Sequence, residues 1–122
     1  MHKVLIIEDD QETQELYRDI LKISDPTHRI TLLMASTQPD AEMLFSDNPD
    51  ISVIIFDGNV PGGKEKTTLA LITKFRQSFK GPMIATSNDE KLQKIMVEIG
   101  CSHRSPKGMS LFKLLMLVLD LN

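Results

Sequence analysis

Carboxylates follow two short apolar runs of this chain, and they are the residues best placed to do chemistry. Residues 4–7 (VLII) run into Glu8, Asp9 and Asp10, and residues 53–56 (VIIF) run into Asp57. Short runs rich in β-branched residues are typical of buried parallel strands, and such sheets bind ligands at the carboxyl ends of their strands. If the two strands are neighbours, about 4.8 Å apart, their acids crowd one site, which is unfavourable without a cation. The sequence therefore predicts an acidic, cation-binding pocket at one edge of an α/β sheet.

A simpler interpretation exists for each acid, because an Asp after a strand is a good N-cap for the next helix. Three acids in succession, matched by Asp57 on another strand, favour the metal site. A few carboxylates with open coordination positions suit Mg²⁺, which also binds phosphate. A carboxylate held beside such an ion can attack a phosphoryl group and form an acyl phosphate, while the metal screens the incoming charge.

Two further residues would complete a phosphoryl site. Ser87 follows the run 83–86 (MIAT), and Lys107 follows a polar segment that begins at Cys101. Taken singly, Ser87 is a strand-end hydroxyl with a local hydrogen bond, and Lys107 is a solvated surface lysine. Together at neighbouring strand ends, they supply what a phosphorylated Asp57 needs, since the lysine neutralises phosphoryl oxygens and the hydroxyl donates to one.

Alternating strand-like and helix-like segments must position these residues. We predict strands over 3–7, 29–35, 51–57, 83–87 and 101–107, and helices over 11–23, 37–47, 64–79, 89–99 and 109–121. Polar content and Pro106 weaken the pattern of the last strand, and the second helix should turn Ala41, Met43, Leu44 and Phe45 inward. Five strand–helix units in this order predict a doubly wound α/β sandwich of helix, sheet and helix.

The bulk composition narrows the function classes. The chain of 122 residues is expected to form one domain, 1–122, and its net charge of −3 does not suggest a nucleic-acid partner. One cysteine, Cys101, excludes an intramolecular disulfide and is consistent with a reducing, cytoplasmic location. We expect no signal peptide and no membrane span, because no apolar stretch reaches about 18 residues. The histidines (His2, His28 and His103) have no metal-binding spacing.

The joint pattern resembles the receiver domain of two-component response regulators. The residues that carry the resemblance are Glu8-Asp9 after the first strand, Asp57 with Pro61-Gly62 after the third, Ser87 after the fourth and Lys107 after Gly100. The match covers essentially the whole chain, in the family's order and close to its spacing. It implies a flavodoxin-like five-stranded parallel sheet of order 2-1-3-4-5 with five helices.

The resemblance also implies roles, position by position. Asp57 matches the phosphoacceptor, charged by a histidine kinase or phosphotransfer protein, and Asp9 matches the direct Mg²⁺ ligand. Glu8 matches an acid that acts through water, and Asn59 the residue whose backbone carbonyl completes the metal site. The remaining matches are Ser87 as switch hydroxyl, Lys107 as phosphate-binding lysine, and Asn88 and Asp89 as positions that tune access and phosphate lifetime. Such a domain catalyses its own phosphoryl transfer and is not otherwise an enzyme.

Several departures fall on the half of the molecule that normally carries output. The family usually has Lys-Pro with a cis peptide where this chain has Lys107-Gly108, and often Tyr or Phe where it has Arg104. Asn88 replaces a small residue, and the loop that follows Ser87 is about two residues short. The metal and acceptor positions are intact, so the resemblance implies phosphorylation more firmly than the usual switch. Output is expected through contact with a downstream protein.

The last predicted helix is apolar on nearly every face, from Leu111 to Leu121. We expect a protein contact there, such as a homodimer, and the alternative is ordinary core with some exposed leucines.

Two other functions compete with phosphorylation. One is a degenerate receiver that binds a partner without being phosphorylated. The other is a nucleotide-binding enzyme, because residues 58–64 (GNVPGGK) fit the start of a P-loop, although Glu65 stands where its Ser or Thr should be.

Overall fold

Helices and strands alternate along the chain in the computed structural model, which describes residues 1–121. The strands are β1 (His2–Ile7), β2 (Ile30–Ala35), β3 (Ile51–Asp57), β4 (Met83–Thr86) and β5 (His103–Ser105). The helices are α1 (Gln11–Ser24), α2 (Gln38–Asp47), α3 (Leu69–Arg76), α4 (Glu90–Ile99) and α5 (Met109–Val118). The predicted order of elements is confirmed.

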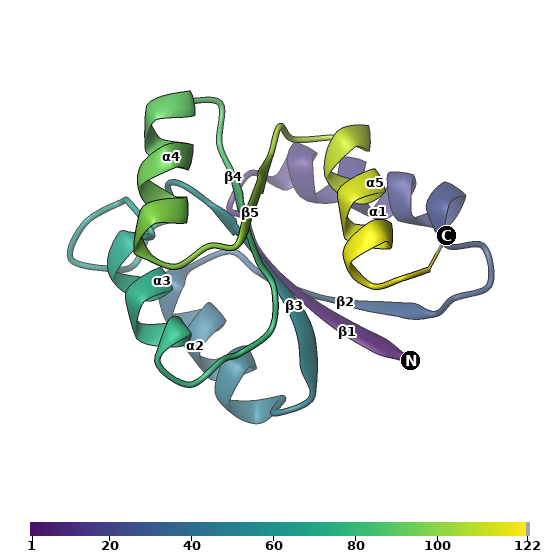
Figure 1. The fold of residues 1–122 in the computed structure, drawn as a ribbon, viewed down its shortest axis with the longest axis horizontal. Coiled ribbons are helices and arrows are strands. Elements are labelled where there is room, and N and C mark those ends of the chain that lie inside the picture. Colours follow the sequence, from purple (N-terminus) through teal and green to yellow (C-terminus); the bar gives the residue numbers. More distant parts are fainter. Residues whose placement is uncertain (122) are drawn as a thin grey trace.

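The strands form one parallel sheet in the order β2-β1-β3-β4-β5. Helices α2, α3 and α4 cover one face of the sheet, and α1 and α5 cover the other (Figure 1). This is the flavodoxin-like, doubly wound architecture that the sequence predicts. The short β5 is indeed a strand, but Pro106 and Lys107 lie beyond its end, which places the lysine in the loop that leads to α5.

The hydrophobic core has two parts because the sheet is buried on both faces. Beneath α2, α3 and α4, Phe56 packs with Phe75, and Phe45 stacks on Phe75 with ring centroids 4.1 Å apart. Beneath α1 and α5, Tyr17 and Phe112 pack at a tilt, with centroids 5.5 Å apart. The central strands β1 and β3 are thereby fixed between two layers, and their carboxyl ends are rigidly placed.

The segment between β3 and α3 differs from the prediction. Helix α3 begins at Leu69 rather than at Lys64, and residues 58–68 form a loop. Gln38 holds this loop, because its side-chain amide donates to the carbonyls of Val60 (2.8 Å) and Glu65 (3.0 Å). The P-loop interpretation fails for this reason: a P-loop leads directly into a helix N-terminus, and Lys64 here is exposed in the middle of a loop.

The exposure of one apolar residue also differs from the prediction. Met43, predicted to face inward, is 63% exposed, because α2 covers the sheet mainly through Ala41. Cys101 is buried and unpaired, beside β5. Among the described residues, none of the helices combines the length and the apolar character that a membrane span requires.

Candidate functional site

Three carboxylates meet at the carboxyl end of the sheet. Strands β1 and β3 are neighbours, with Ile7 paired to Phe56, so the residues that follow them come together as predicted. Glu8, Asp9 and Asp57 each offer an oxygen, and these oxygens all lie within 4.8 Å of one another. Glu8 and Asp57 are buried, whereas Asp9 is exposed to solvent.

Lys107 supplies the compensating positive charge. Its Nζ donates to Glu8 Oε1 at 2.8 Å and lies 3.4 Å from Asp57 Oδ1. The side chain comes from the β5–α5 loop on the far side of β4, and only 21% of it is exposed. Lys107 therefore bridges the two buried acids. A group bound to Asp57 would also contact this lysine.

Burial and charge set the ionisation of this pocket. Burial first, and then the charge of Glu8, raise the pKa of Asp57 to about 6, while Lys107 and the Gly58 N–H hold it down. Burial by itself lowers the pKa of Lys107, but the hydrogen bond to Glu8 and the charges of both acids outweigh it, so that the pKa is raised. Lys107 is thus firmly cationic, and Asp57 is ionised at neutral pH.

The residues fit a hard divalent cation. Carboxylate oxygens are the ligands that Mg²⁺ prefers. Burial is the main cause that raises the pKa of Asp57, and the charge of Glu8 adds to it, so the two acids repel each other although Lys107 contacts both. The exposed Asp9 leaves one side of the cluster open to solvent and water ligands. Glu8, Asp9 and Asp57 are the residues that would hold the ion.

Several solved structures that this chain resembles are receiver domains of response regulators. A receiver domain protein from Clostridium thermocellum superposes with a TM-score of 0.78 at 17% identity, covering 99% of this chain and 94% of that one. The activated N-terminal receiver domain of Klebsiella pneumoniae RstA, with BeF₃, gives 0.76 at 20% identity and 99% of both chains. The Mn²⁺-bound response regulator Rcp1 gives 0.69 at 19% identity, with 99% and 91% covered. Comparison by sequence finds no matching family model and no matching curated protein.

The chain has the fold of a receiver domain. These likenesses extend over its whole length, and they agree with the resemblance seen in the sequence. At such low identity they establish the fold, and the roles of single residues depend on the geometry of this chain.

Asp10 serves a structural purpose in this chain. It is the N-cap of α1, and its Oδ2 accepts from the Thr13 backbone N–H (2.9 Å) and from the Thr13 hydroxyl (2.6 Å). These hydrogen bonds with Thr13 lower the pKa of Asp10. The helix-cap interpretation therefore holds for Asp10, while Asp9 is the one that joins the cluster.

Ser87 follows β4, and its side chain is buried. Its hydroxyl accepts from the Asp89 N–H at 3.1 Å, and its carbonyl accepts from the Gln93 side chain at 2.5 Å. Because the hydroxyl accepts from Asp89, its own O–H is still available as a donor. Nearby, the Thr68 hydroxyl donates to the Asp57 carbonyl at 2.7 Å and so fixes the acceptor's backbone.

The other predicted site positions lie around the rim. Asn59 is exposed and bridges to Thr67 across the β3–α3 loop. Asn88 is exposed, and Asp89 caps α4 by accepting from the Lys91 and Leu92 N–H groups. Arg104 is exposed on β5, as the sequence suggested, beside Lys94 and Val97 of α4. Every described peptide bond is trans, including Lys107-Gly108.

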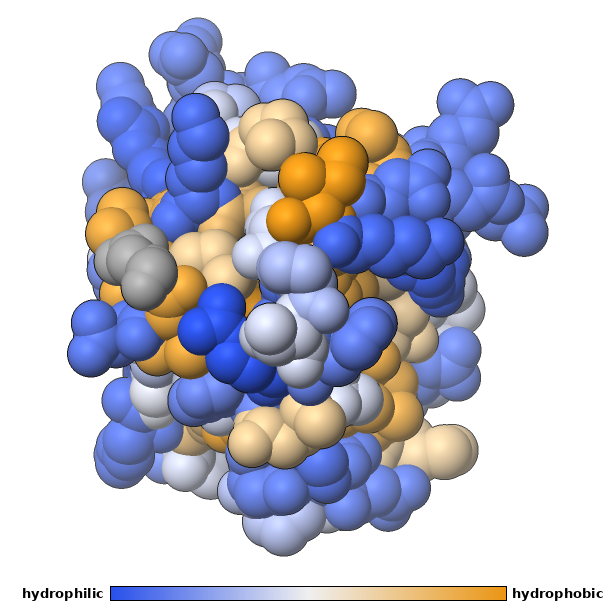
Figure 2. Space-filling view, turned by 90° about the vertical axis from the view of Figure 1, so that its right-hand side faces the viewer, coloured by the Kyte–Doolittle hydropathy of each residue, from blue (hydrophilic) through white to orange (hydrophobic). Residues whose placement is uncertain are grey.

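The last helix is less exposed than its composition suggested. Four residues of α5 are buried in the core: Leu111, Phe112, Leu115 and Met116. Past the first turn of this helix, the large apolar side chain that is exposed is Leu117, at 61%. The face that carries α1 and α5 shows small apolar patches among hydrophilic side chains, not one broad area (Figure 2). The structure favours the alternative of core with exposed leucines, and a homodimer stays a prediction.

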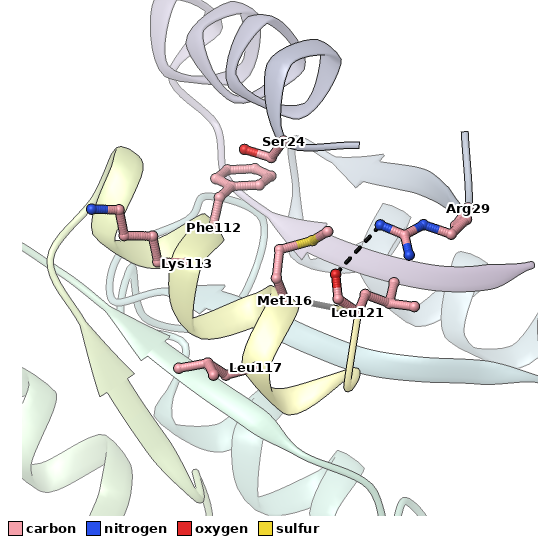
Figure 3. Close-up of a pocket in the computed structure, with 7 residues that line it drawn as sticks. All are labelled: Ser24, Arg29, Phe112, Lys113, Met116, Leu117 and Leu121. Atoms are coloured by element: carbon pink, nitrogen blue, oxygen red, sulfur yellow. Dashed lines mark hydrogen bonds between the residues drawn. The ribbon is translucent and has the colours of Figure 1, made fainter. Parts of the chain in front are cut away.

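A cavity of about 540 Å³ lies between α5, the end of α1 and the start of β2 (Figure 3). Phe112, Met116 and Leu117 line it from α5, and Arg29 crosses it to donate to the Leu121 carbonyl at 3.4 Å. None of the residues that line this cavity belongs to the predicted phosphoryl or metal site. It is set apart from the acidic cluster.

Sequence reasoning missed the side chains that hold the site from within. The Gln14 amide donates to the Glu8 carbonyl at 2.6 Å and to the Ser36 hydroxyl, and so ties α1 to the end of β1. Tyr17 and Thr86 bring two buried hydroxyls beneath the acids. The period of two along β4 could have identified Thr86, because it shares a sheet face with Ile84 and, through the strand pairing, with Asp57.

Proposed function

We propose that this chain is a response-regulator receiver that accepts a phosphoryl group on Asp57 in a Mg²⁺-dependent reaction. The observation that supports this best is the constellation of Glu8, Asp9 and Asp57 oxygens within 4.8 Å of one another, bridged by Lys107. Few structural tasks need three acids and one lysine in a half-buried pocket, whereas phosphoryl transfer needs a carboxylate nucleophile and concentrated positive charge.

Asp57 is the nucleophile in this proposal. Its pKa of about 6 leaves the carboxylate ionised at neutral pH, yet poorly solvated. A carboxylate oxygen attacks phosphorus, the bond from phosphorus to the donor's leaving group breaks, and an acyl phosphate forms on Asp57. The donor is a histidine kinase or phosphotransfer protein, with its phosphohistidine nitrogen as leaving group.

Lys107 and Ser87 serve the product. Lys107 already lies 3.4 Å from Asp57 Oδ1, so its ammonium would move little to pair with a phosphoryl oxygen. Ser87 would donate its O–H to a phosphoryl oxygen while it still accepts from the Asp89 N–H. Mg²⁺, held by the three acids, would neutralise the charge of the incoming phosphoryl group. Glu8 and Asp9 would act by holding that ion.

Signalling would proceed through a protein target, within the cytoplasm. A degenerate receiver that binds its partner without phosphorylation is the second candidate. It is favoured by one feature: Arg104 is an exposed charged residue on β5, at a position where the family often has Tyr or Phe. The two proposals differ in whether Asp57 is modified.

Incubation with acetyl phosphate, with and without Mg²⁺, distinguishes them. Intact mass spectrometry of the wild type should show addition of one phosphoryl group only with Mg²⁺, and Asp57→Asn should show none. Asp50→Asn is the matched control, because Asp50 is an exposed partner of Lys3 at the opposite end of β3. A folded, Mg²⁺-loaded wild type that never gains the mass would favour the phosphorylation-independent module.

A further inference from the structure

Two buried hydroxyls lie in the core beneath the acidic site without a hydrogen-bond partner. Tyr17 Oη and Thr86 Oγ1 are both enclosed, with the residues 0% and 1% exposed, and neither has a partner among the described residues. An unpaired buried polar atom costs about 1–3 kcal/mol. Because native proteins keep few such atoms, each calls for a functional or structural reason.

Strand pairing places the Thr86 hydroxyl next to the acceptor. Thr86 of β4 pairs with Asp57 of β3, just as Ile84 pairs with Ile55. Side chains at paired positions of neighbouring parallel strands lie on the same sheet face, about 4.8 Å apart. The Thr86 hydroxyl is therefore beside the Asp57 side chain, on the face that α1 and α5 cover.

Tyr17 approaches the same point from α1. Its ring packs on Phe112 in the core, and its hydroxyl end lies close to the acids. After burial itself, the charge of Glu8 is the next cause that raises the pKa of Tyr17; Asp57 also raises it, and an interaction with the Thr86 hydroxyl lowers it. The phenol thus faces Thr86, at a separation or angle that falls short of a formed hydrogen bond.

We propose that Thr86 and Tyr17 form an inner hydroxyl layer of the acceptor site, which closes into a hydrogen-bonded chain from Tyr17 to Thr86 to the Asp57 side chain when charge is added at Asp57. This inference rests on the proposed function. The ionised Asp57 already carries one negative charge, and a phosphoryl group or its mimic adds further negative charge at the same site. Because hydrogen bonds to charged acceptors are stronger than neutral ones, the more negative site draws in the donors that lie unused in the free protein. Tyr17 is a positioning residue here, acting through Thr86.

The position of Tyr17 makes this layer a route out of the site. Phe112, which packs on Tyr17, also lines the cavity between α1 and α5, where its ring points toward Ser24 (Figure 3). A shift of the phenol toward Thr86 therefore changes the packing between α1 and α5. The route starts on α1 and does not use the exposed β5 position, which Arg104 occupies.

The chain has one tyrosine and no tryptophan, so its intrinsic tyrosine fluorescence reports Tyr17 alone. The emission is measured as Mg²⁺ and beryllofluoride, a stable phosphoryl mimic, are added, while fluorine NMR records whether beryllofluoride binds. We expect the emission of the wild type to change on binding. Thr86→Val, which loses only the hydroxyl, should lose the change, and Thr86→Ser should keep it. Thr73→Val, at an exposed position of α3, is the control and should respond as the wild type.

Constant wild-type emission with beryllofluoride bound would overturn the inference, as would a full response in Thr86→Val. Failure of the proposed function has a different signature, because fluorine NMR would then show no bound beryllofluoride. In that case urea denaturation of the metal-free protein tests the layer: because the Thr86 hydroxyl is buried without a partner there, Thr86→Val should be at least as stable as the wild type, and a clear loss of stability would overturn the inference. Circular dichroism verifies that each variant is folded.

Discussion

Replacing Asp57 by Asn should stabilise the metal-free protein at neutral pH. In the folded state burial, followed by the charge of Glu8, raises the pKa of Asp57 to about 6 from an ordinary 3.8. Ionising Asp57 is therefore harder in the folded than in the unfolded chain, and its charge costs stability wherever it is present. A neutral amide of nearly the same shape removes that cost, while Lys107 keeps its 2.8 Å bond to Glu8.

The magnitude follows from the pKa difference. About two pH units correspond to about 3 kcal/mol, and the solvent that still reaches the Asp57 side chain reduces this to about 2 kcal/mol. The sign is checked by linkage: between the two pKa values the folded state binds more protons, so stability falls as pH rises from about 4 to about 6. The advantage of Asp57→Asn should be complete at pH 7 and nearly gone at pH 4.

Urea denaturation in the presence of a chelator, from about pH 4 to about pH 7, measures this difference. Adding Mg²⁺ should reverse the order, because a ligand present at about 100 times its dissociation constant stabilises the wild type by about 2.7 kcal/mol and the variant has lost a ligand. An Asp57→Asn protein that is no more stable than the wild type at pH 7 would refute the reasoning. So would an advantage that does not shrink as the pH falls.

Four other substitutions test the same site. Lys107→Gln leaves Glu8 and Asp57 without their cation and should cost about 2 kcal/mol in urea denaturation, whereas Lys74→Gln, in the exposed pair with Glu42, should cost less than about 1 kcal/mol; equal costs would contradict the assigned burial. Asp9→Ala and Glu8→Ala should each weaken Mg²⁺ binding in calorimetry, and unchanged affinity in both would remove the metal site. Asp10→Ala should lose about 1 kcal/mol of stability with the α1 cap yet keep its Mg²⁺ affinity, and a loss of affinity would make Asp10 a ligand.

The parts of this fold that the sequence predicts are those with a local pattern. Apolar runs of β-branched residues mark the strands, and the acids that follow them mark the carboxyl edge of the sheet, so the meeting of Glu8 and Asp57 could be anticipated. The wrong start of α3 has a distant cause: residues 64–67 are compatible with a helix, but Gln38 binds the loop carbonyls instead. A contact across the fold overrides local propensity there.

The roles of neighbouring acids were harder to separate. Asp9 and Asp10 are adjacent and identical in type, and only the geometry of the helix start makes Asp10 a cap and leaves Asp9 in the cluster. The approach of Tyr17 to Thr86 depends also on how α1 packs on the sheet, which has no signature in the chain itself.

The most direct test of the account is to locate the phosphoryl group chemically. After incubation with acetyl phosphate and Mg²⁺, borohydride reduces an acyl phosphate to the alcohol, and peptide mass spectrometry identifies the reduced residue. The account predicts homoserine at position 57 and nowhere else, and none when Mg²⁺ is omitted. Reduction at another acid, or an unreduced Asp57 in a folded, Mg²⁺-loaded protein, would contradict it.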